Sequence, residues 1–201
     1  MKIDDALKYL RENSKQRKFA QSVDLIINLK NIDLKKPENK FSKEVLLPNG
    51  CGKEISVGII SDKISGAVTK ADIETFEKDK KKLKQFTKQY DFTIAEAPLM
   101  PLVGKVLGRH LAPRGRMPKL LPPGRNPQMM VDELKNSVRI RVRDSPTIQV
   151  LAGSEEMSDA QLKENIGKIL DEVSKSLPKG KNQVKDIHIK MTMGKPVKID
   201  V

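Results

Sequence analysis

The side chains best able to bind a ligand in this sequence are cations in a stretch that lacks acids. No Asp or Glu occurs between Ala97 and Val131, and six Lys or Arg fall between Lys105 and Arg125, interleaved with Gly and Pro. Such a stretch presents an unneutralised positive field, which attracts polyanions. The candidates for non-specific contact with phosphate groups are Lys105, Arg109, Arg114 and Arg116. The alternative, a connector whose glycines serve backbone geometry, stays open on composition alone.

The overall charge points to the same class of ligand. The 201 residues carry 39 Lys and Arg against 26 Asp and Glu, a net charge of +13. This excess favours RNA, DNA or an anionic membrane surface as partner. The membrane is disfavoured because no apolar run approaches the ~20 residues that span a bilayer. Cys51 is the only cysteine, which excludes an internal disulfide and fits a reducing cytosol.

Known catalytic motifs are missing. The sequence contains no Gly-x-Gly-x-x-Gly, no phosphate-binding P-loop and no Gly-x-Ser-x-Gly, and its two histidines have no second ligand at metal spacing. We therefore expect no catalysis, no cofactor and no metal site. Two alternatives stay open: a nucleic-acid-processing enzyme with a basic substrate groove, which would need carboxylates or histidines near the arginines, and a DNA-binding regulator, for which no helix-turn-helix or zinc pattern is visible.

The aromatic content is low, at 3% with no Trp. This argues against a protein that grips single strands mainly by stacking bases on rings. It suits recognition of a folded RNA through its shape, phosphates and sugar hydroxyls.

Hydrophobic periodicity predicts the elements that must position these cations. Ile3, Leu7 and Leu10 form the apolar stripe of a first helix, and a strand with one buried face follows from about Phe19 to Lys30. Further strands are predicted at 42–47, 57–60, 92–95, from 148 and near both 187–191 and 197–201. Helices are predicted at 71–86, 127–137 and from Ser158, and the basic stretch 104–125 is predicted to be a loop.

The two ends of the chain resemble each other in character, and the middle differs from both. Each end combines a helix with two-sided strands, whereas the middle alternates short apolar strands with helices. We therefore predict an α/β (α+β) fold with two domains. Residues 1–55 and 148–201 form a split two-layer α/β domain, and residues 56–147 form an inserted Rossmann-like α/β domain.

A split domain brings two distant segments to one sheet edge. Lys18 and Phe19 open the first long strand, and Thr192, Met193 and Gly194 follow a strand near the C-terminus. A hydroxyl, an apolar side chain and a glycine that permits close approach suit the minor groove of RNA, which is lined by 2′-hydroxyls. A plain hairpin turn is the alternative interpretation of the second segment.

Three motifs resemble one known family. The stretch from Met100 to Arg109, continued from Ala112 to Pro118, resembles the signature of the first protein of the large ribosomal subunit, the L-one family. Further matches are Arg17 to Asp24 and Thr192 to Gly194. The resemblance extends over essentially the whole chain, in order, and the Leu121-Pro122-Pro123 run is similar to the archaeal branch.

The resemblance implies a role as a structural constituent of the ribosome in the cytoplasm. It implies binding to the large-subunit rRNA element that forms the mobile stalk near the exit-site tRNA, and translational repression through a mimic of that element on the protein's own mRNA. It also implies a monomer when free, with no membrane partner. The resemblance places the family's specific RNA contacts on Lys18, Phe19, Ser22, Asp24, Gln149, Thr192, Met193 and Gly194. The basic stretch would then make only non-specific contacts with RNA.

Overall fold

The computed structural model describes residues 1–15, 17–36, 39–64, 66–122 and 124–200. The chain divides into two compact units, one formed by Met1–Lys53 with Asn136–Val201 and the other by Glu54–Lys135. We call these the split unit and the inserted unit.

The split unit is built on a four-stranded antiparallel sheet in the order β7-β1-β8-β9. Its strands are β1 (Ser22–Leu29), β7 (Thr147–Ser154), β8 (Val184–Met191) and β9 (Val197–Ile199). The central strand β1 pairs with β7 on one side and β8 on the other, so the N-terminal strand is held between two C-terminal ones.

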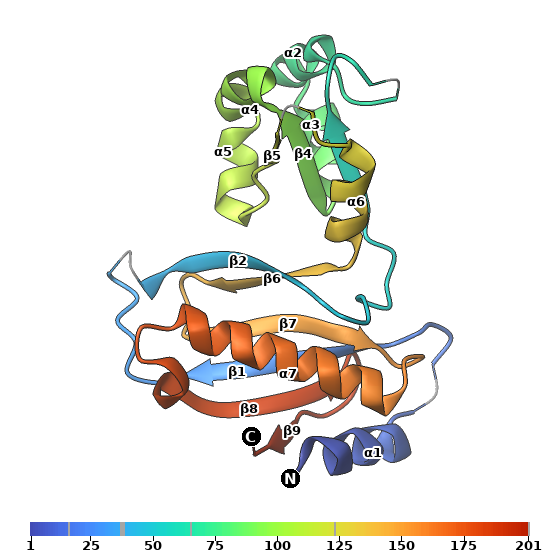
Figure 1. Cartoon of the computed structure of the whole chain (residues 1–201), viewed down its shortest axis with the longest axis vertical. Coiled ribbons are helices and arrows are strands. Elements are labelled where there is room, and N and C mark those ends of the chain that lie inside the picture. The colour runs from blue at the N-terminus through green and yellow to red at the C-terminus, as the bar shows by residue number, and fades with distance from the viewer. Residues whose placement is uncertain (16, 37–38, 65, 123, 201) are drawn as a thin grey trace. The chain divides into compact units, whose positions relative to one another are not determined.

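One face of this sheet is covered by helices. Helix α7 (Asp159–Ser176) lies across it and α1 (Ile3–Asn13) lies near β9, as Figure 1 shows. Val23, Leu25, Ile27 and Leu29 of β1 point into this layer and are buried, as the alternating pattern predicted. The alternate residues of β1 are half exposed on the opposite face. We call that face the open face.

A second, two-stranded sheet completes the split unit. Strands β2 (Phe41–Leu46) and β6 (Ser137–Val142) pair antiparallel, and a short helix η4 (Gly180–Gln183) precedes β8. The completely buried Asn165 joins α7 to this region: its Oδ1 accepts from the N–H of Asn49 at 3.2 Å, and its Nδ2 donates to the carbonyls of Gly50 and Ala152, each at 2.9 Å. A polar side chain is tolerated here because its amide is fully hydrogen-bonded.

The inserted unit contains a three-stranded parallel sheet in the order β3-β4-β5. Both faces are covered, since Ile94 and Ala95, neighbours on β4, belong to two different apolar clusters. The helix α6 covers one face, and the other helices cover the second. The elements are β3 (Val57–Ile60), α2 (Lys70–Lys78), α3 (Lys80–Gln89), β4 (Phe92–Glu96), η2 (Ala97–Leu99), α4 (Met100–Val106), α5 (Gly108–Leu111), η3 (Ala112–Arg114), β5 (Lys119–Leu121) and α6 (Pro127–Lys135).

The basic stretch is not the loop that its Gly and Pro content predicted. Much of it is helical, in α4, α5 and η3. Val103, Leu107 and Leu111 recur every four residues and are buried in the core of the inserted unit. The burial of these apolar residues therefore outweighs the helix-destabilising effect of the glycines, which is ~1 kcal/mol for each glycine relative to alanine.

The sequence placed the second domain boundary too late. Residues 136–147 were assigned to the insert, but they belong to the split unit. The reason is the pairing of β6 with β2, in which Val45 lies opposite Val138 and Phe41 opposite Val142. The sequence patterns predicted a helix up to Ser137 and no strand after it, so β6 was missed.

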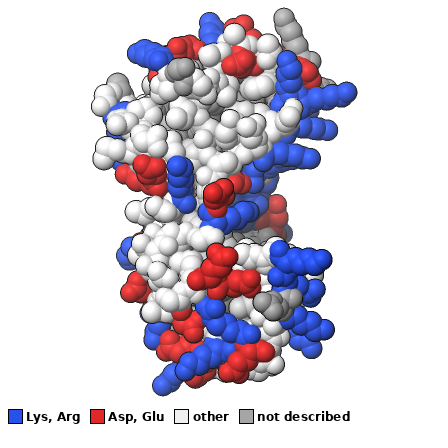
Figure 2. Space-filling view, turned by 90° about the vertical axis from the view of Figure 1, so that its right-hand side faces the viewer, with Lys and Arg blue, Asp and Glu red and all other residues white. Residues whose placement is uncertain are grey.

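The overall class is confirmed as a mixed α/β fold. No helix in the described ranges combines the length and apolarity needed to cross a bilayer. Charge is unevenly spread over the surface: on the face shown in Figure 2, Lys and Arg crowd one edge of each unit, while Asp and Glu stand mainly elsewhere.

Candidate nucleic-acid interface

A clamp of three hydrogen bonds joins the two segments that the sequence singled out. The backbone N–H of Ser22 donates to Oγ1 of Thr192 at 2.9 Å, and the N–H of Thr192 donates to the carbonyl of Ser22 at 3.0 Å. The hydroxyl of Thr192 also donates weakly to the same carbonyl, at 3.4 Å. The start of β1 and the turn after β8 therefore lie side by side, 170 residues apart in sequence.

The side chain of Gln21 forms further hydrogen bonds that hold the two segments together. Its side chain is 2% exposed, and its Oε1 accepts from the N–H of Met193 at 3.3 Å. Its Nε2 donates to the carbonyl of Lys15 at 3.4 Å and to Glu155 at 3.3 Å. One buried amide thus fixes the segment after α1 and the Thr192–Gly194 turn.

The open face brings further predicted residues together. Asp24 lies opposite Lys190 on one neighbouring strand and Leu151 on the other, and Gln149 lies opposite Ile26. Together they line a shallow hollow of about 240 Å³. A carboxylate, an amide and an ammonium group on a rigid sheet can accept from ribose hydroxyls and pair with a phosphate.

The ionised carboxylate of Asp24 is destabilised in the free protein. Burial raises the pKa of its carboxyl above the usual 3.8, and nearby Lys190 opposes this only in part. The folded state therefore disfavours the charged form, and this penalty is present at neutral pH and disappears as the pH falls through the raised pKa. A stability cost at this position is consistent with a carboxylate kept for binding.

Replacing Asp24 by Asn is expected to separate stability from binding. The neutral isostere removes the burial penalty, so the thermal midpoint at pH 7 should rise, and the difference from the native chain should shrink towards about pH 4. RNA affinity should fall, by ~1–3 kcal/mol, because an ionised acceptor is lost. Thermal melts at both pH values and a filter-binding titration measure the two effects. A variant that loses stability at pH 7 and binds RNA normally would contradict this role.

Gly194 is not demanded by the free fold. A Cβ built on it would meet atoms of Met191 only at 3.4–3.6 Å, which is ordinary contact. The absence of a side chain at this exposed turn instead leaves room for close approach by a ligand.

Lys18 and Phe19 lie before β1 and not inside it, which corrects the predicted start of that strand. Both are exposed, and the ring of Phe19 is 51% exposed. They connect Arg17 and Gln21, two residues that line a cavity together with Met193 and Gly194. The structure therefore places all eight predicted contact residues in the split unit.

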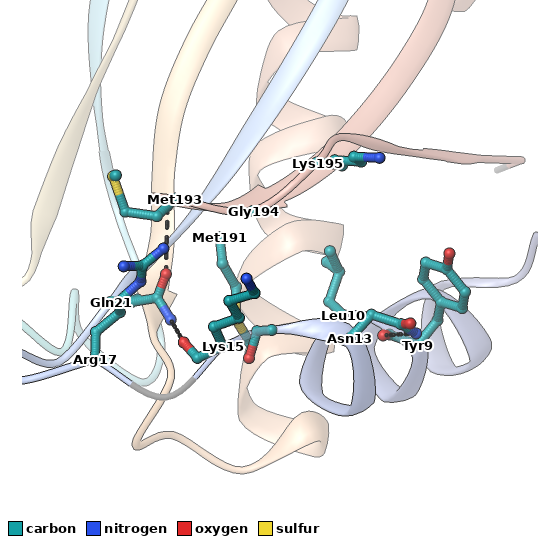
Figure 3. A pocket seen from close by; sticks show the side chains of 11 residues that line it. Tyr9, Leu10, Asn13, Lys15, Arg17, Gln21, Met191, Met193, Gly194 and Lys195 are labelled. Atoms are coloured by element: carbon teal, nitrogen blue, oxygen red, sulfur yellow. Dashed lines mark hydrogen bonds between the residues drawn. The ribbon is translucent and has the colours of Figure 1, made fainter.

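This cavity, of about 430 Å³, lies between the end of α1 and the turn after β8. Leu10 and Met191, both under 5% exposed, provide apolar lining, and Lys15, Arg17 and Lys195 provide positive charge. No described lining residue is acidic. Figure 3 shows Tyr9 at one end, with Arg17 and Met193 at the other. We call it the Tyr9 pocket.

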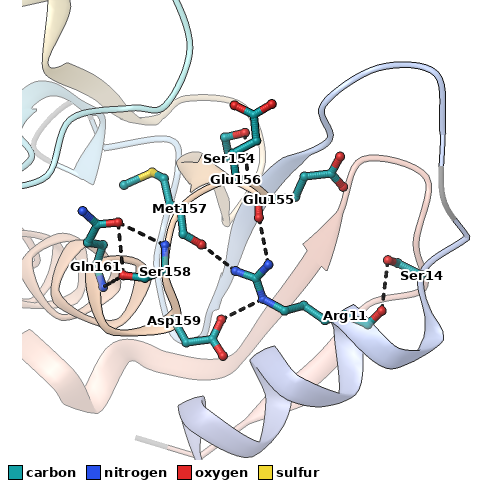
Figure 4. A network of polar contacts seen from close by, with 9 residues as sticks. All are labelled: Arg11, Ser14, Ser154, Glu155, Glu156, Met157, Ser158, Asp159 and Gln161. Carbon is teal, nitrogen blue, oxygen red and sulfur yellow. Dashed lines mark hydrogen bonds and ion pairs between the residues drawn. The ribbon is translucent and has the colours of Figure 1, made fainter.

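Arg11 holds α1, and with it one wall of the Tyr9 pocket, against the rest of the split unit. Its guanidinium donates to Asp159 at 2.8 Å, to the carbonyl of Glu155 at 2.8 Å and to that of Met157 at 2.5 Å (Figure 4). Such a planar group with several fixed donors orients a helix more firmly than a lysine could. The first helix is therefore positioned by the loop that begins α7.

The predicted phosphate contacts of the inserted unit do not behave alike. Lys105 on α4 and Arg109 on α5 are exposed, as a phosphate contact requires, and Arg114 is also exposed. Arg116 is occupied: its Nη1 donates to the carbonyls of Thr87 at 3.0 Å and Tyr90 at 3.4 Å, and it lies 3.7 Å from Asp91. Arg116 is thus a cap for the last turn of α3, which the prediction of a phosphate contact did not foresee.

Replacing Arg116 by Gln should therefore act on stability first. Two carbonyls at the end of α3 lose their donor, and the inserted unit should lose ~1–2 kcal/mol. The discrimination between a fragment of large-subunit rRNA and an unrelated hairpin should stay unchanged. Urea unfolding and a two-RNA titration test this, with Arg109 to Gln as the exposed control that leaves stability unaltered. Loss of discrimination with unchanged stability would contradict this expectation and make Arg116 a specific contact to RNA.

Sequence reasoning missed Tyr9, Asn13, Lys15, Arg17 and Lys195 as lining residues of one pocket. One signal was available. Tyr9 lies outside the apolar stripe of its helix, and an aromatic side chain on the polar face of a helix is unusual in a chain with so few aromatic residues. Within the described residues, no three His, Cys, Asp or Glu side chains gather in a way that could hold a metal ion.

Comparison with known proteins identifies the family. The model of the ribosomal protein L1p/L10e family matches residues 10–195. Three proteins named large ribosomal subunit protein uL1 are similar over nearly their full lengths. That of Methanothermobacter thermautotrophicus is 40% identical, covering 98% of both chains. That of Pyrococcus horikoshii is 42% identical, covering 99% of this chain and 95% of the relative. That of Methanocaldococcus jannaschii is 43% identical, covering 96% and 93%. The resemblance drawn from the three motifs is confirmed, and the chain belongs to the ribosomal protein L1p/L10e family.

Proposed function

We propose that this chain is a structural constituent of the large ribosomal subunit in the cytoplasm, without enzymatic activity. It binds the rRNA element that forms the mobile stalk, near the tRNA in the exit site. It also represses translation of its own mRNA by binding a mimic of that element. The split unit carries specificity, and the cations of the inserted unit add salt-dependent affinity.

One observation supports this proposal above the others: the clamp between Ser22 and Thr192. It assembles a hydroxyl, exposed backbone and a glycine beside the open face, where Asp24, Gln149 and Lys190 stand. Rigid donors and acceptors on a sheet match the 2′-hydroxyls and phosphates of a folded RNA. The alternative of a nucleic-acid-processing enzyme draws no support from this surface, since its described residues offer no cluster of carboxylates or histidines.

A hydroxyl-radical footprint on total large-subunit rRNA tests the first part. We expect protection of one hairpin-and-loop element at protein concentrations that leave unrelated hairpins unprotected. Scattered protection that vanishes with salt would reduce the protein to a non-specific binder and contradict the proposal.

The repressor role needs a separate measurement. An RNA covering the start of the protein's own message should compete with the stalk fragment for binding, and added protein should lower translation of that message in a cell-free system. A reporter without the leader is the control. Equal translation of both messages would remove the repressor role and leave the ribosomal one intact.

A further inference from the structure

The lining of the Tyr9 pocket is partly apolar and partly positively charged. Its lining combines apolar Leu10 and Met191 with three cations, Lys15, Arg17 and Lys195. A volume of about 430 Å³ is large for a phosphate group alone and lies within the range of sites that hold small organic ligands. A nucleotide, with a planar base and a phosphate, matches both halves of this lining.

The three described cavities of the split unit differ in the charge of their lining residues. The cavity beside α7 and β9 includes Asp171, Asp186 and Asp200, and the hollow on the open face includes Asp24. The Tyr9 pocket includes no acid among its described lining residues. Of these three cavities, this one therefore offers an anion positive partners without a facing carboxylate.

Tyr9 gives this pocket an exposed aromatic ring. The chain has five Phe and two Tyr, and the only ones among its exposed large apolar side chains are Tyr9, 48% exposed, and Phe19, 51% exposed. Met193, 61% exposed, stands at the other end of the pocket from Tyr9 (Figure 3). An exposed ring beside a cationic pocket is the usual arrangement for stacking a base that has left its helix.

The scarcity of rings limits what this site can do. One ring cannot form a platform for a run of bases, so the pocket can hold a single base while the rest of the RNA is read by shape. Asn13 also lines the pocket: its Nδ2 donates to the carbonyl of Tyr9 at 2.9 Å, and its Oδ1 is an acceptor that can bond the edge of a base.

We infer that the Tyr9 pocket receives one unstacked nucleotide of the bound RNA, with its base against Tyr9 and its phosphate near Lys15 and Lys195. This inference rests on the proposed function, because the nucleotide belongs to the stalk RNA held by the adjacent Thr192–Gly194 turn. It adds a base-selective contact to a surface that otherwise reads sugar and phosphate.

The first experiment pairs a protein variant with an RNA variant. Tyr9→Ala should weaken binding of the stalk fragment roughly 5- to 150-fold, and Tyr9→Phe, which keeps the ring, should bind like the native chain. Abasic sites are then placed in turn at each unpaired nucleotide. At one position the abasic RNA should weaken binding to the native protein by a similar factor and cost the Tyr9→Ala protein nothing further. Equal losses for both proteins at every position overturn the inference.

The second experiment needs no protein variant. 5-Iodouridine or 5-iodocytidine at the position found by the abasic scan should form a photocrosslink to the peptide that contains Tyr9, identified by mass spectrometry. A crosslink only to other peptides overturns the inference, even if a variant of Tyr9 fails to fold. The proposed function itself is overturned if the native chain binds the stalk fragment no better than an unrelated hairpin of equal length. That result differs from both outcomes above, in which the native chain still prefers the stalk fragment.

Discussion

Thr192 replaced by valine should lose 5- to 150-fold in affinity for the stalk RNA, equivalent to ~1–3 kcal/mol, with little loss of stability. Valine keeps the shape of threonine and removes Oγ1, so the N–H of Ser22 loses its acceptor and the turn after β8 loses its clamp. The hydroxyl has one lone pair left for a 2′-OH of the RNA, which valine also removes. Filter binding of the stalk fragment measures the loss.

Serine at position 192 is the matched control. It restores the hydroxyl without the methyl group and should bind within a few-fold of the native chain. A direct contact can be separated from a positioning effect by single 2′-deoxy substitutions in the RNA: a direct contact predicts one position that costs the native protein affinity and costs the valine variant nothing. Native affinity for the valine variant would remove Thr192 from the interface.

Asn165 replaced by leucine should produce the largest loss of stability. The volumes are similar, but three backbone groups that the amide now satisfies lose their partner. The carbonyl of Ala152 is buried, and the N–H of Asn49 and the carbonyl of Gly50 are partly buried. At ~1–3 kcal/mol for each unsatisfied group, the split unit should lose at least about 3 kcal/mol, which lowers the thermal midpoint by roughly 6–12 °C. Calorimetry or thermal circular dichroism measures this.

The exposed Asn182 provides the control for that experiment. The same change, Asn to Leu, on this surface side chain should alter the free energy of unfolding by no more than about 0.5 kcal/mol. A small effect at both positions would mean that water enters and satisfies the groups around residue 165.

Local patterns in the sequence were sufficient for the elements with strong periodicity. The alternation in β1 predicted that one of its faces is buried, and the helix predicted from Ser158 is α7, with Ser158 as its N-cap. These outcomes depend on residues close together in the chain, where period and burial are directly linked.

The errors arose where tertiary contacts decide. Asp79 divides the helix predicted at 71–86, because its carboxylate accepts from the N–H groups of Lys81 and Lys82 and so begins α3. The side chain of Arg116 donates to backbone carbonyls at the end of α3, a pairing that no pattern of side chains reveals. The Tyr9 pocket combines the first helix with a turn near residue 194, and only the pairing of β1 with β8 brings those together.

The central position of β1 sets the order in which a newly made chain can fold. Both of its partners, β7 and β8, emerge from the translating ribosome more than a hundred residues after it, whereas all strands of the inserted unit emerge together, between residues 57 and 121. The inserted unit can therefore form while synthesis continues, and β1 waits unpaired. Because Thr192 completes the clamp, a nascent chain can form that clamp only after residue 192 has been added.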